Sequence, residues 1–287
     1  MITQVALPLA LAFIMFAMGL TMPAGDFRLV FGRPKALIAG VLAKLVLLPL
    51  VGLALVVVWR PEPDFAVGLL LLAACPAGVT SSLLTHFAGG RIALAATITA
   101  ITSLAASLSV PLLVNLGLAA FAGFDHPVEI PVERVVFGIF LVDTVPLALG
   151  LLLGRFRPAL AARLGRLARP VATLLFALIV AGAFVSQRQT LVEHVGDVVP
   201  VALALNLAAM ALAWGLGGAL RLELADRIAV VMENGLQNGA VGIFVAVTLL
   251  DSHAMMVPSI AYAFVMNLTA LAFIAVVRRR KAIPTRA

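Results

Sequence analysis

Charged residues, cysteines and the motifs of common hydrolases are scarce or missing in this sequence. Only 11% of the 287 residues are charged, whereas a soluble domain carries roughly 25%. The single cysteine, Cys75, excludes an intramolecular disulfide and a cysteine-ligated metal cluster. The sequence also lacks an HExxH zinc pair and a Gly-x-Ser-x-Gly nucleophile. These shortages argue against a soluble globular protein and against an enzyme.

Apolar residues, in contrast, make up 63% of the chain and give a mean hydropathy of +1.16. Long apolar runs recur along the whole length, and most approach the roughly 20 residues that a helix needs to cross a bilayer. The pattern predicts an all-α polytopic membrane protein embedded in a lipid bilayer. The nine expected spans are residues 5–22, 35–58, 66–87, 92–118, 134–153, 171–186, 198–219, 228–249 and 257–277.

The basic residues lie almost entirely in the loops between these spans. A net charge of +7 would suggest a nucleic-acid partner in a soluble protein, but here we expect none. Short cytoplasmic loops are enriched in Lys and Arg, so the loops report topology. Arg60, Arg134 and Arg188 fall on one side, and Lys44 falls inside a span. We therefore predict an external N-terminus, a cytoplasmic C-terminus and a bacterial inner membrane. The cytoplasmic set is Arg28, Arg33, Lys35, Arg91, Arg155, Arg157, Arg163, Arg166, Arg169, Arg221, Arg227, Arg278, Arg279, Arg280, Lys281 and Arg286.

Two of the expected spans contain residues that break a helix in mid-membrane. The span 66–87 contains Pro76 and Gly78, and the span 228–249 contains the run Met-Glu-Asn-Gly-Leu-Gln-Asn-Gly at 232–239. Non-helical backbone at that depth is tolerated only inside protein or beside a cavity. These spans are the third and the eighth, so they run in opposite directions. The arrangement is typical of inverted repeats with two crossed, broken helices at the binding site of a secondary transporter.

Polar residues near these breaks are the candidate site residues, because charged groups inside a membrane are costly and usually functional. Glu233 and Gln237 lie one helical turn apart and supply hard oxygen ligands for Na⁺, or a relay for H⁺. The alternative is a polar network that only packs helices together. Thr80, Ser81 and Ser82 follow the first break, where the start of a half-helix favours an anion. Plain capping by one hydroxyl is the alternative there.

The other polar residues within the spans leave two interpretations each. Lys44 either snorkels to the cytoplasmic face or pairs with an anionic partner, for which Glu233 is the obvious candidate. Asp143 either faces a cavity or bonds to a neighbouring helix. Asn267 is the only strongly polar residue in the last span and favours a site role, whereas Asn206 fits a site or interhelical packing equally.

Five stretches of the sequence resemble the bile acid:sodium symporter family. They are MFAMGLTMPAGDF (15–27), RPKALIAGVLAKLVLLPL (33–50), CPAGVTSSLLTHFAGG (75–90), ENGLQNG (233–239) and FVMNLTA (264–270). The resemblance implies a core and a panel subdomain with alternating access between them, in the nine-helix form of the fold. The panel is then formed by about 5–22, 134–153 and 171–186, and the core by about 35–118 and 198–277.

The resemblance also implies roles for individual residues. Glu233, Gln237, Ser81 and Thr99 match sodium ligands of the family, while Asn238 and Asn267 match asparagines near the substrate. Three positions depart from the family, because Ser82 replaces an asparagine, Ala95 replaces a serine and Lys44 replaces a glutamine that supports the second sodium. An ammonium there is expected to repel Na⁺ and to pair with the carboxylate. The coupling ion is therefore Na⁺ or H⁺.

Together these observations predict a secondary active transporter of a small organic anion. Transport by alternating access would be coupled to a cation or proton through Glu233. The substrate-binding candidates are Thr80, Asn238 and Asn267, and the coupling candidates are Glu233, Gln237, Ser81, Ser82, Thr99 and Lys44. A cation/proton antiporter built on a similar crossed-helix plan is the alternative.

Overall fold

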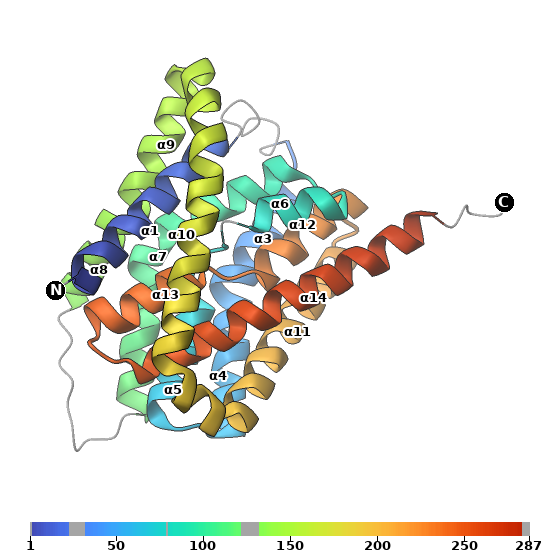
Figure 1. Cartoon of the computed structure of the whole chain (residues 1–287). Helices are drawn as coiled ribbons and strands as arrows, with labels where there is room; N and C mark the ends of the chain where they lie inside the picture. The colour runs from blue at the N-terminus through green and yellow to red at the C-terminus, as the bar shows by residue number, and fades with distance from the viewer. Residues whose placement is uncertain (1, 23–31, 79, 122–131, 283–287) are drawn as a thin grey trace.

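The computed structural model describes residues 2–22, 32–78, 80–121 and 132–282, and every regular segment within these ranges is helical (Figure 1). Six helical stretches in the described part of the chain are long and apolar enough to cross a membrane, and three shorter ones are equally apolar. The chain is therefore an integral, polytopic, all-α membrane protein. Two basic residues of the topology argument, Arg28 and Arg286, lie outside the described residues.

Most of the expected spans correspond to continuous helices whose ends agree to within a turn or so. Pro34–Trp59 and Val132–Phe156 each consist of two α-helices that join through a wider, π-helical segment. The continuous stretches are α1 Ile2–Thr21, α3 Pro34–Leu42 with η1 Ala43–Leu47 and α4 Leu48–Trp59, α7 Ile92–Phe121, α8 Val132–Ile139 with η2 Phe140–Thr144 and α9 Val145–Phe156, α10 Pro158–Glu193, α11 Val195–Ala219, and α14 Val257–Ala282.

Two of the three π-helical segments in the described residues, η1 and η2, share a sequence cause. Pro49 is the second residue of α4 and Pro146 the second of α9, and each follows directly after a π-helical segment. A proline inside a helix has no N–H to donate, and its ring crowds the carbonyl four residues earlier. The widened turn before each proline accommodates both effects. The two segments contain Lys44 and Asp143, which are charged residues in the middle of apolar helices.

Both predicted interruptions are present, and they meet. Helix α5 Pro63–Ala74 is followed by α6 Ser81–Ala88, and α12 Leu224–Gly235 is followed by α13 Gly239–Phe244, which continues into η3 Val245–Leu249. Between them, Gly78 N–H donates to Leu236 O at 3.2 Å and Asn238 N–H donates to Pro76 O at 2.8 Å. A side chain at Gly78 would come within 2.8 Å of the Gln237 carbonyl, so the close approach requires glycine. The breaks thus bond to each other and satisfy one another's backbone groups.

The sixth span is much longer than predicted. The sequence places it at 171–186 and assigns the basic stretch before it to a loop, whereas α10 begins at Pro158. Its first half buries Ala161, Gly165, Ala168 and Ala172. Their spacing of three or four residues is one face of a helix, and that face packs on α1. The basic side chains occupy the other faces, so the loop prediction is wrong.

The helices form two packing groups. Helix α1 packs mainly on α9 and α10, and Gly19 and Gly150 allow the backbones of α1 and α9 to approach closely. In the second group α5 packs on α7, while α11 packs on α12 and α14. The interrupted helices lie in the second group, next to α1.

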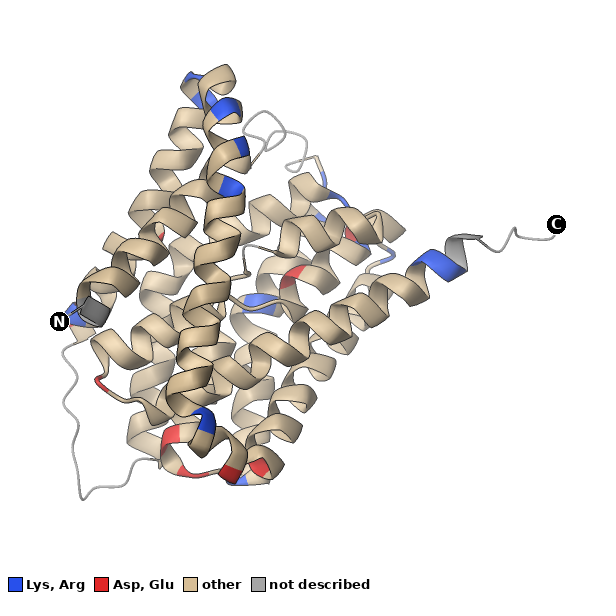
Figure 2. Cartoon of the chain, viewed as in Figure 1, with Lys and Arg blue, Asp and Glu red and all other residues tan. Residues whose placement is uncertain are grey.

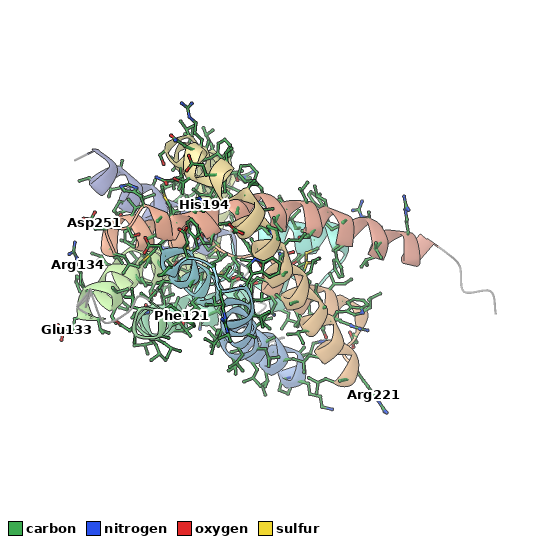
Figure 3. The ribbon with its side chains drawn as sticks, turned by 90° about the horizontal axis from the view of Figure 1, so that it is seen from below. Phe121, Glu133, Arg134, His194, Arg221 and Asp251 are labelled. Atoms are coloured by element: carbon green, nitrogen blue, oxygen red, sulfur yellow. The ribbon has the colours of Figure 1, made fainter. Side chains whose placement is uncertain are left out.

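The charged residues gather at the ends of the helices. Figure 2 shows the ribbon coloured blue for Lys and Arg at the upper ends of α9 and α10 and along the right edge, and most of the red Asp and Glu positions along the lower and left edges. Figure 3 shows Arg221 at the end of the molecule opposite Glu133, Arg134 and Asp251. The charge asymmetry expected from the sequence is thus visible among the described residues.

An ion cluster ties three helices together at the basic end. The buried Asp226 carboxylate accepts hydrogen bonds from Arg33, at 2.9 Å, and from Arg91. Glu223 also pairs with both arginines, at 2.7 and 2.9 Å. These hydrogen bonds raise the pKa of Arg33 above its ordinary value. The cluster fixes the starts of α3, α7 and α12 relative to one another.

Candidate functional site

A buried polar cluster lies where the two helix interruptions meet. It draws one residue from η1, one from α6, one from α7, one from α12 and one from the second break, and none of the five is more than 2% exposed. The five residues are Lys44, Ser81, Thr99, Glu233 and Gln237. The structure therefore brings together five of the six coupling candidates predicted from the sequence.

Lys44 points into this cluster. Its Nζ donates to the main-chain carbonyl of Glu233 at 3.0 Å and to Oε1 of Gln237. The Glu233 carbonyl is free to accept because α12 ends at Gly235, which leaves the last carbonyls of the helix without their usual partners. Snorkelling to the cytoplasmic face is wrong, because Lys44 is 2% exposed. The expected direct ion pair is also wrong, because no carboxylate oxygen of Glu233 lies within 4.0 Å of Nζ among the described contacts, although the two charges still interact electrostatically over a longer distance.

The Glu233 carboxylate faces hydroxyl groups instead. Its Oε2 accepts a hydrogen bond from Thr99 Oγ1, and the Ser81 hydroxyl bonds to the same carboxylate. Oε1 is fully buried and has no hydrogen-bond partner among the described residues. A buried carboxylate oxygen without a donor is costly. This oxygen is therefore the position where a proton or a cation would be stabilised.

Gln237 and Asn238 stabilise the interruption between α12 and α13. Gln237 Nε2 donates to Asn234 O at 2.9 Å, while its Oε1 accepts from Lys44. Asn238 caps α13, because its Oδ1 accepts from Val241 N–H at 3.4 Å. Its Nδ2 points to Met15 Sδ on α1, at 3.4 Å. Asn238 thus contacts α1 as well as its own break.

Three predicted residues make no hydrogen bond to the cluster. Thr80 precedes α6, but its side chain does not cap the helix, so the capping alternative is wrong for this residue. Asn267 Nδ2 donates to Ala263 O of its own helix at 2.6 Å. Ser82 faces a separate pocket. The roles assigned to these residues stay predictions.

Tyr262 is a buried polar residue at the cluster that the sequence reasoning missed. Its hydroxyl donates to Gly235 O at 2.9 Å, and Asn206 Nδ2 donates to the same carbonyl at 2.7 Å. The Asn206 amide also bonds to the Tyr262 hydroxyl at 3.1 Å. These two side chains satisfy the end of α12 beside the break. The signal in the sequence was that Tyr262 is the only tyrosine in a chain with many phenylalanines.

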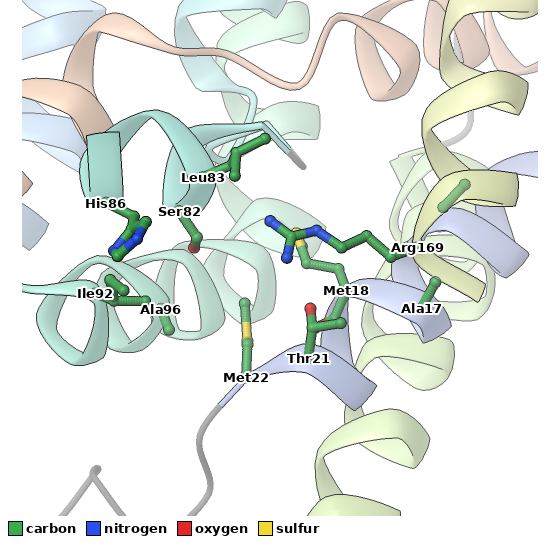
Figure 4. Close-up of a pocket in the computed structure, with 11 residues that line it drawn as sticks. Ala17, Met18, Thr21, Met22, Ser82, Leu83, His86, Ile92, Ala96 and Arg169 are labelled. Carbon is green, nitrogen blue, oxygen red and sulfur yellow. The ribbon is translucent and has the colours of Figure 1, made fainter. Parts of the chain in front are cut away.

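A pocket of about 280 Å³ opens between α1, α6, α7 and α10. Figure 4 shows the Arg169 side chain reaching from α10 across this pocket toward Ser82, with Thr21 and Met18 close by. His86 lies on the opposite wall. The sequence placed Arg169 in a cytoplasmic loop, whereas the structure places it on a helix, lining a cavity. The pocket lies between the two packing groups, and the Arg169 guanidinium is part of its lining.

Comparisons with known proteins point to one family. The model of the sodium bile acid symporter family matches residues 8–194. The chain is 28% identical over 250 residues to the "Probable sodium/metabolite cotransporter BASS2, chloroplastic" of Oryza sativa subsp. japonica, which covers 87% of this chain and 58% of that protein. It is 29% identical over 233 residues to the "Uncharacterized sodium-dependent transporter YocS" of Bacillus subtilis (strain 168), covering 81% and 70%. The chain thus spans less than two thirds of the rice protein.

Proposed function

This chain belongs to the sodium bile acid symporter family, a family of transporters, and on that premise we propose that it moves a small organic anion across a membrane by alternating access. The observation that carries the proposal is the buried cluster at two interrupted helices that bond to each other. Broken helices that meet around polar groups in mid-membrane are the usual binding-site architecture of secondary transporters.

We further propose nine membrane spans arranged as inverted repeats. The interruptions in α5–α6 and α12–α13, five spans apart in the proposed order, support this arrangement. The panel subdomain would consist of α1, α8, α9 and α10. The core subdomain would be the packing group that contains the two interrupted helices. The packing groups described above support this division, because the pocket with Arg169 lies between them.

The pocket supports a small anion as the substrate. Arg169 is the cation among its lining residues, and a guanidinium binds carboxylates through two parallel hydrogen bonds. A drug-sized ligand occupies a pocket of roughly 300–1,000 Å³, and this one measures about 280 Å³. The volume favours a small carboxylate over a steroid-sized substrate. Proteoliposome uptake of labelled monocarboxylates and dicarboxylates, compared with empty liposomes, tests the proposal. Sodium flux without any carboxylate uptake would instead indicate a cation/proton antiporter.

The buried polar cluster supports a coupling ion other than the sodium in the names of the relatives. The names of the two relatives describe a probable sodium/metabolite cotransporter and a sodium-dependent transporter. A sodium ion in such a cluster needs several oxygen ligands. In this chain the Lys44 ammonium already bonds to two of the available oxygens, Glu233 O and Gln237 Oε1. We propose that Lys44 supplies the positive charge that a second sodium would otherwise bring. Glu233 then couples transport through a proton held at Oε1.

Replacing Arg169 tests the anion-binding role of the pocket. Arg169→Gln is expected to raise the KM for carboxylate uptake about tenfold or more, because a hydrogen bond to a charged group contributes about 1.5–3 kcal/mol. Arg163→Gln on the same helix is the matched control, since Arg163 is exposed and lies outside the pocket. Equal KM values in the two variants would remove Arg169 from the substrate site.

Reporter fusions test the proposed topology, with the N-terminus outside and the C-terminus in the cytoplasm of a bacterial inner membrane. A reporter that is active only in the cytoplasm should work after Arg280 and fail after Gln4. The charge asymmetry is the physical reason, because Lys and Arg are retained in cytoplasmic loops. Activity at both ends would require an even number of spans, which is incompatible with the proposed repeats.

A further inference from the structure

Asp143 is a second buried carboxylate, outside the cluster at the helix breaks. It lies in the π-helical segment η2 and is 1% exposed. Neither Oδ1 nor Oδ2 has a hydrogen-bond partner among the described residues. A bond to a neighbouring helix, one of the sequence-based alternatives, is therefore wrong. Asp143 does not line the pocket beside Arg169, so the other alternative, a side chain that faces a cavity, gains no support from that pocket.

Among the residues that the structure describes, no cationic side chain contacts Asp143. The segment η2 packs against α1 and α7, and neither helix contains a charged or titratable side chain. On its own helix pair, Glu133 and Arg134 precede it and Arg155 follows it, each roughly 13 Å or more away along the axis at 1.5 Å per residue. The titratable group with an electrostatic interaction to Asp143 is the buried thiol of Cys75. Lys44 also interacts with that thiol, but it has no described contact with Asp143.

The position of Asp143 is central along a membrane-spanning stretch. Val132–Phe156 is long and apolar enough to cross a bilayer, and Asp143 is near its midpoint. An ionised carboxylate there, with no donor and no counter-ion, carries a large desolvation penalty. Its neutral, protonated form avoids most of that penalty. In this conformation Asp143 therefore holds a proton.

The neighbours of Asp143 link the two packing groups. Thr144 Oγ1 donates to Ser103 O of α7 at 3.3 Å and lies 3.0 Å from Ser107 Oγ. Ser103 Oγ is buried and has no partner of its own among the described residues. A displacement of α8 and α9 relative to α7 would break these hydrogen bonds and expose polar groups beside Asp143. Water entering there would stabilise the ionised carboxylate.

We propose that Asp143 is a proton-binding site, separate from the Glu233 cluster, that takes up and releases one proton during each transport cycle. This proposal rests on the alternating-access function proposed above. In the closed interface the carboxylic O–H bond is intact. When the interface opens, a water molecule accepts that proton, the O–H bond breaks, and the carboxylate and a hydronium ion result. On the other side a hydronium ion donates a proton to the carboxylate, which restores the carboxylic acid and leaves water before the interface closes.

Infrared difference spectroscopy on the purified full chain tests the protonation directly. The wild type at neutral pH should show the C=O stretching band of a protonated carboxylic acid. Asp143→Asn should lose this band, Asp143→Glu should keep a shifted one, and the exposed Glu133→Gln should leave it unchanged. Glu233→Gln should keep the band of Asp143, which distinguishes this carboxylic acid from that of Glu233. Identical spectra for the wild type and Asp143→Asn would overturn the proposal.

A second measurement in proteoliposomes separates this proposal from the proposed function. Uptake of a labelled monocarboxylate by the wild type should increase severalfold when an inward proton gradient is imposed. Asp143→Asn should show a clearly smaller increase, because only the Glu233 proton remains, whereas Glu133→Gln should keep the full increase. If the variant keeps the full response, the proton site is wrong while the transport function stands. If no carboxylate is transported by any variant, the proposed function fails, and the infrared result still decides the protonation of Asp143.

Discussion

Glu233→Ala is expected to abolish uptake, with a loss of at least about 100-fold, while the protein still inserts into the membrane. The carboxylate is fully buried, and its Oε1 has no partner among the described residues. Oε2 links α12 to α7 through Thr99, whereas Oε1 is left to bind a proton or a cation. The change removes a negative charge near Lys44, and leaving a buried charge without compensation costs about 3–5 kcal/mol. We expect lower stability but a folded protein, because Lys44 keeps both of its oxygen acceptors.

Uptake at equal expression is the measurement, with two variants for comparison. Gln237→Ala should reduce uptake in the same way, because it removes one of the two acceptors of Lys44 and a bond to Asn234 O. Glu193→Gln is the matched control, since this glutamate is exposed and accepts a hydrogen bond from Gln189 on its own helix, far from the cluster in the sequence. Wild-type uptake in Glu233→Ala would show that the cluster only packs helices.

Lys44→Gln is expected to create a dependence on sodium that the wild type lacks. The substitution removes the ammonium from Glu233 O and Gln237 Oε1 and adds an amide oxygen at the same place. Three neutral oxygens and the Glu233 carboxylate then lie where a cation is needed, and carbonyl, amide and carboxylate oxygens are suitable ligands.

Thermal unfolding in detergent gives a measurement that needs no substrate. A ligand that binds only the folded state stabilises it by about 2.7 kcal/mol at 100 times its Kd. Sodium chloride should therefore raise the Tm of Lys44→Gln above its value in choline chloride, and it should leave the wild type unchanged. Lys35→Gln is the control, because Lys35 is exposed at the start of α3. A sodium-dependent Tm in the wild type would show that Lys44 does not take the place of the ion.

The helix interruptions were predictable because their cause is local. Pro76, Gly78 and the amide-rich run at 232–239 cannot continue an apolar helix, and buried backbone groups require partners wherever a helix stops. The sequence therefore predicted both breaks and their involvement with Glu233. It did not predict that the two breaks would bond to each other at Gly78 and Asn238, because that pairing joins segments far apart in the chain.

The partner of Lys44 was predicted wrongly for a physical reason. Charge complementarity suggested the Glu233 carboxylate, but the end of α12 leaves a main-chain carbonyl available, and a lysine ammonium bonds to carbonyl oxygens readily. Which of these oxygens the ammonium reaches depends on the packing of α3 and η1 against α12. A pattern of residue types does not contain that information.

Arg169 was assigned to a loop because basic residues in a membrane protein usually report topology. The small residues between Ala161 and Ala172 have helical spacing, but the same stretch contains three arginines and Pro170. These arginines favoured a cytoplasmic loop over a helix in the interpretation of the sequence. The length of α10, and with it the cation in the pocket, became evident only from the packing against α1.

The central claim is that the Lys44 ammonium takes the place of a coupling sodium ion, and uptake under defined ion gradients tests it most directly. Proteoliposomes containing the wild type or Lys44→Gln are given a labelled monocarboxylate with an inward gradient of sodium, potassium or choline. We expect equal wild-type uptake in all three salts and faster Lys44→Gln uptake in sodium alone. Wild-type uptake that collapses when choline replaces sodium would contradict the claim.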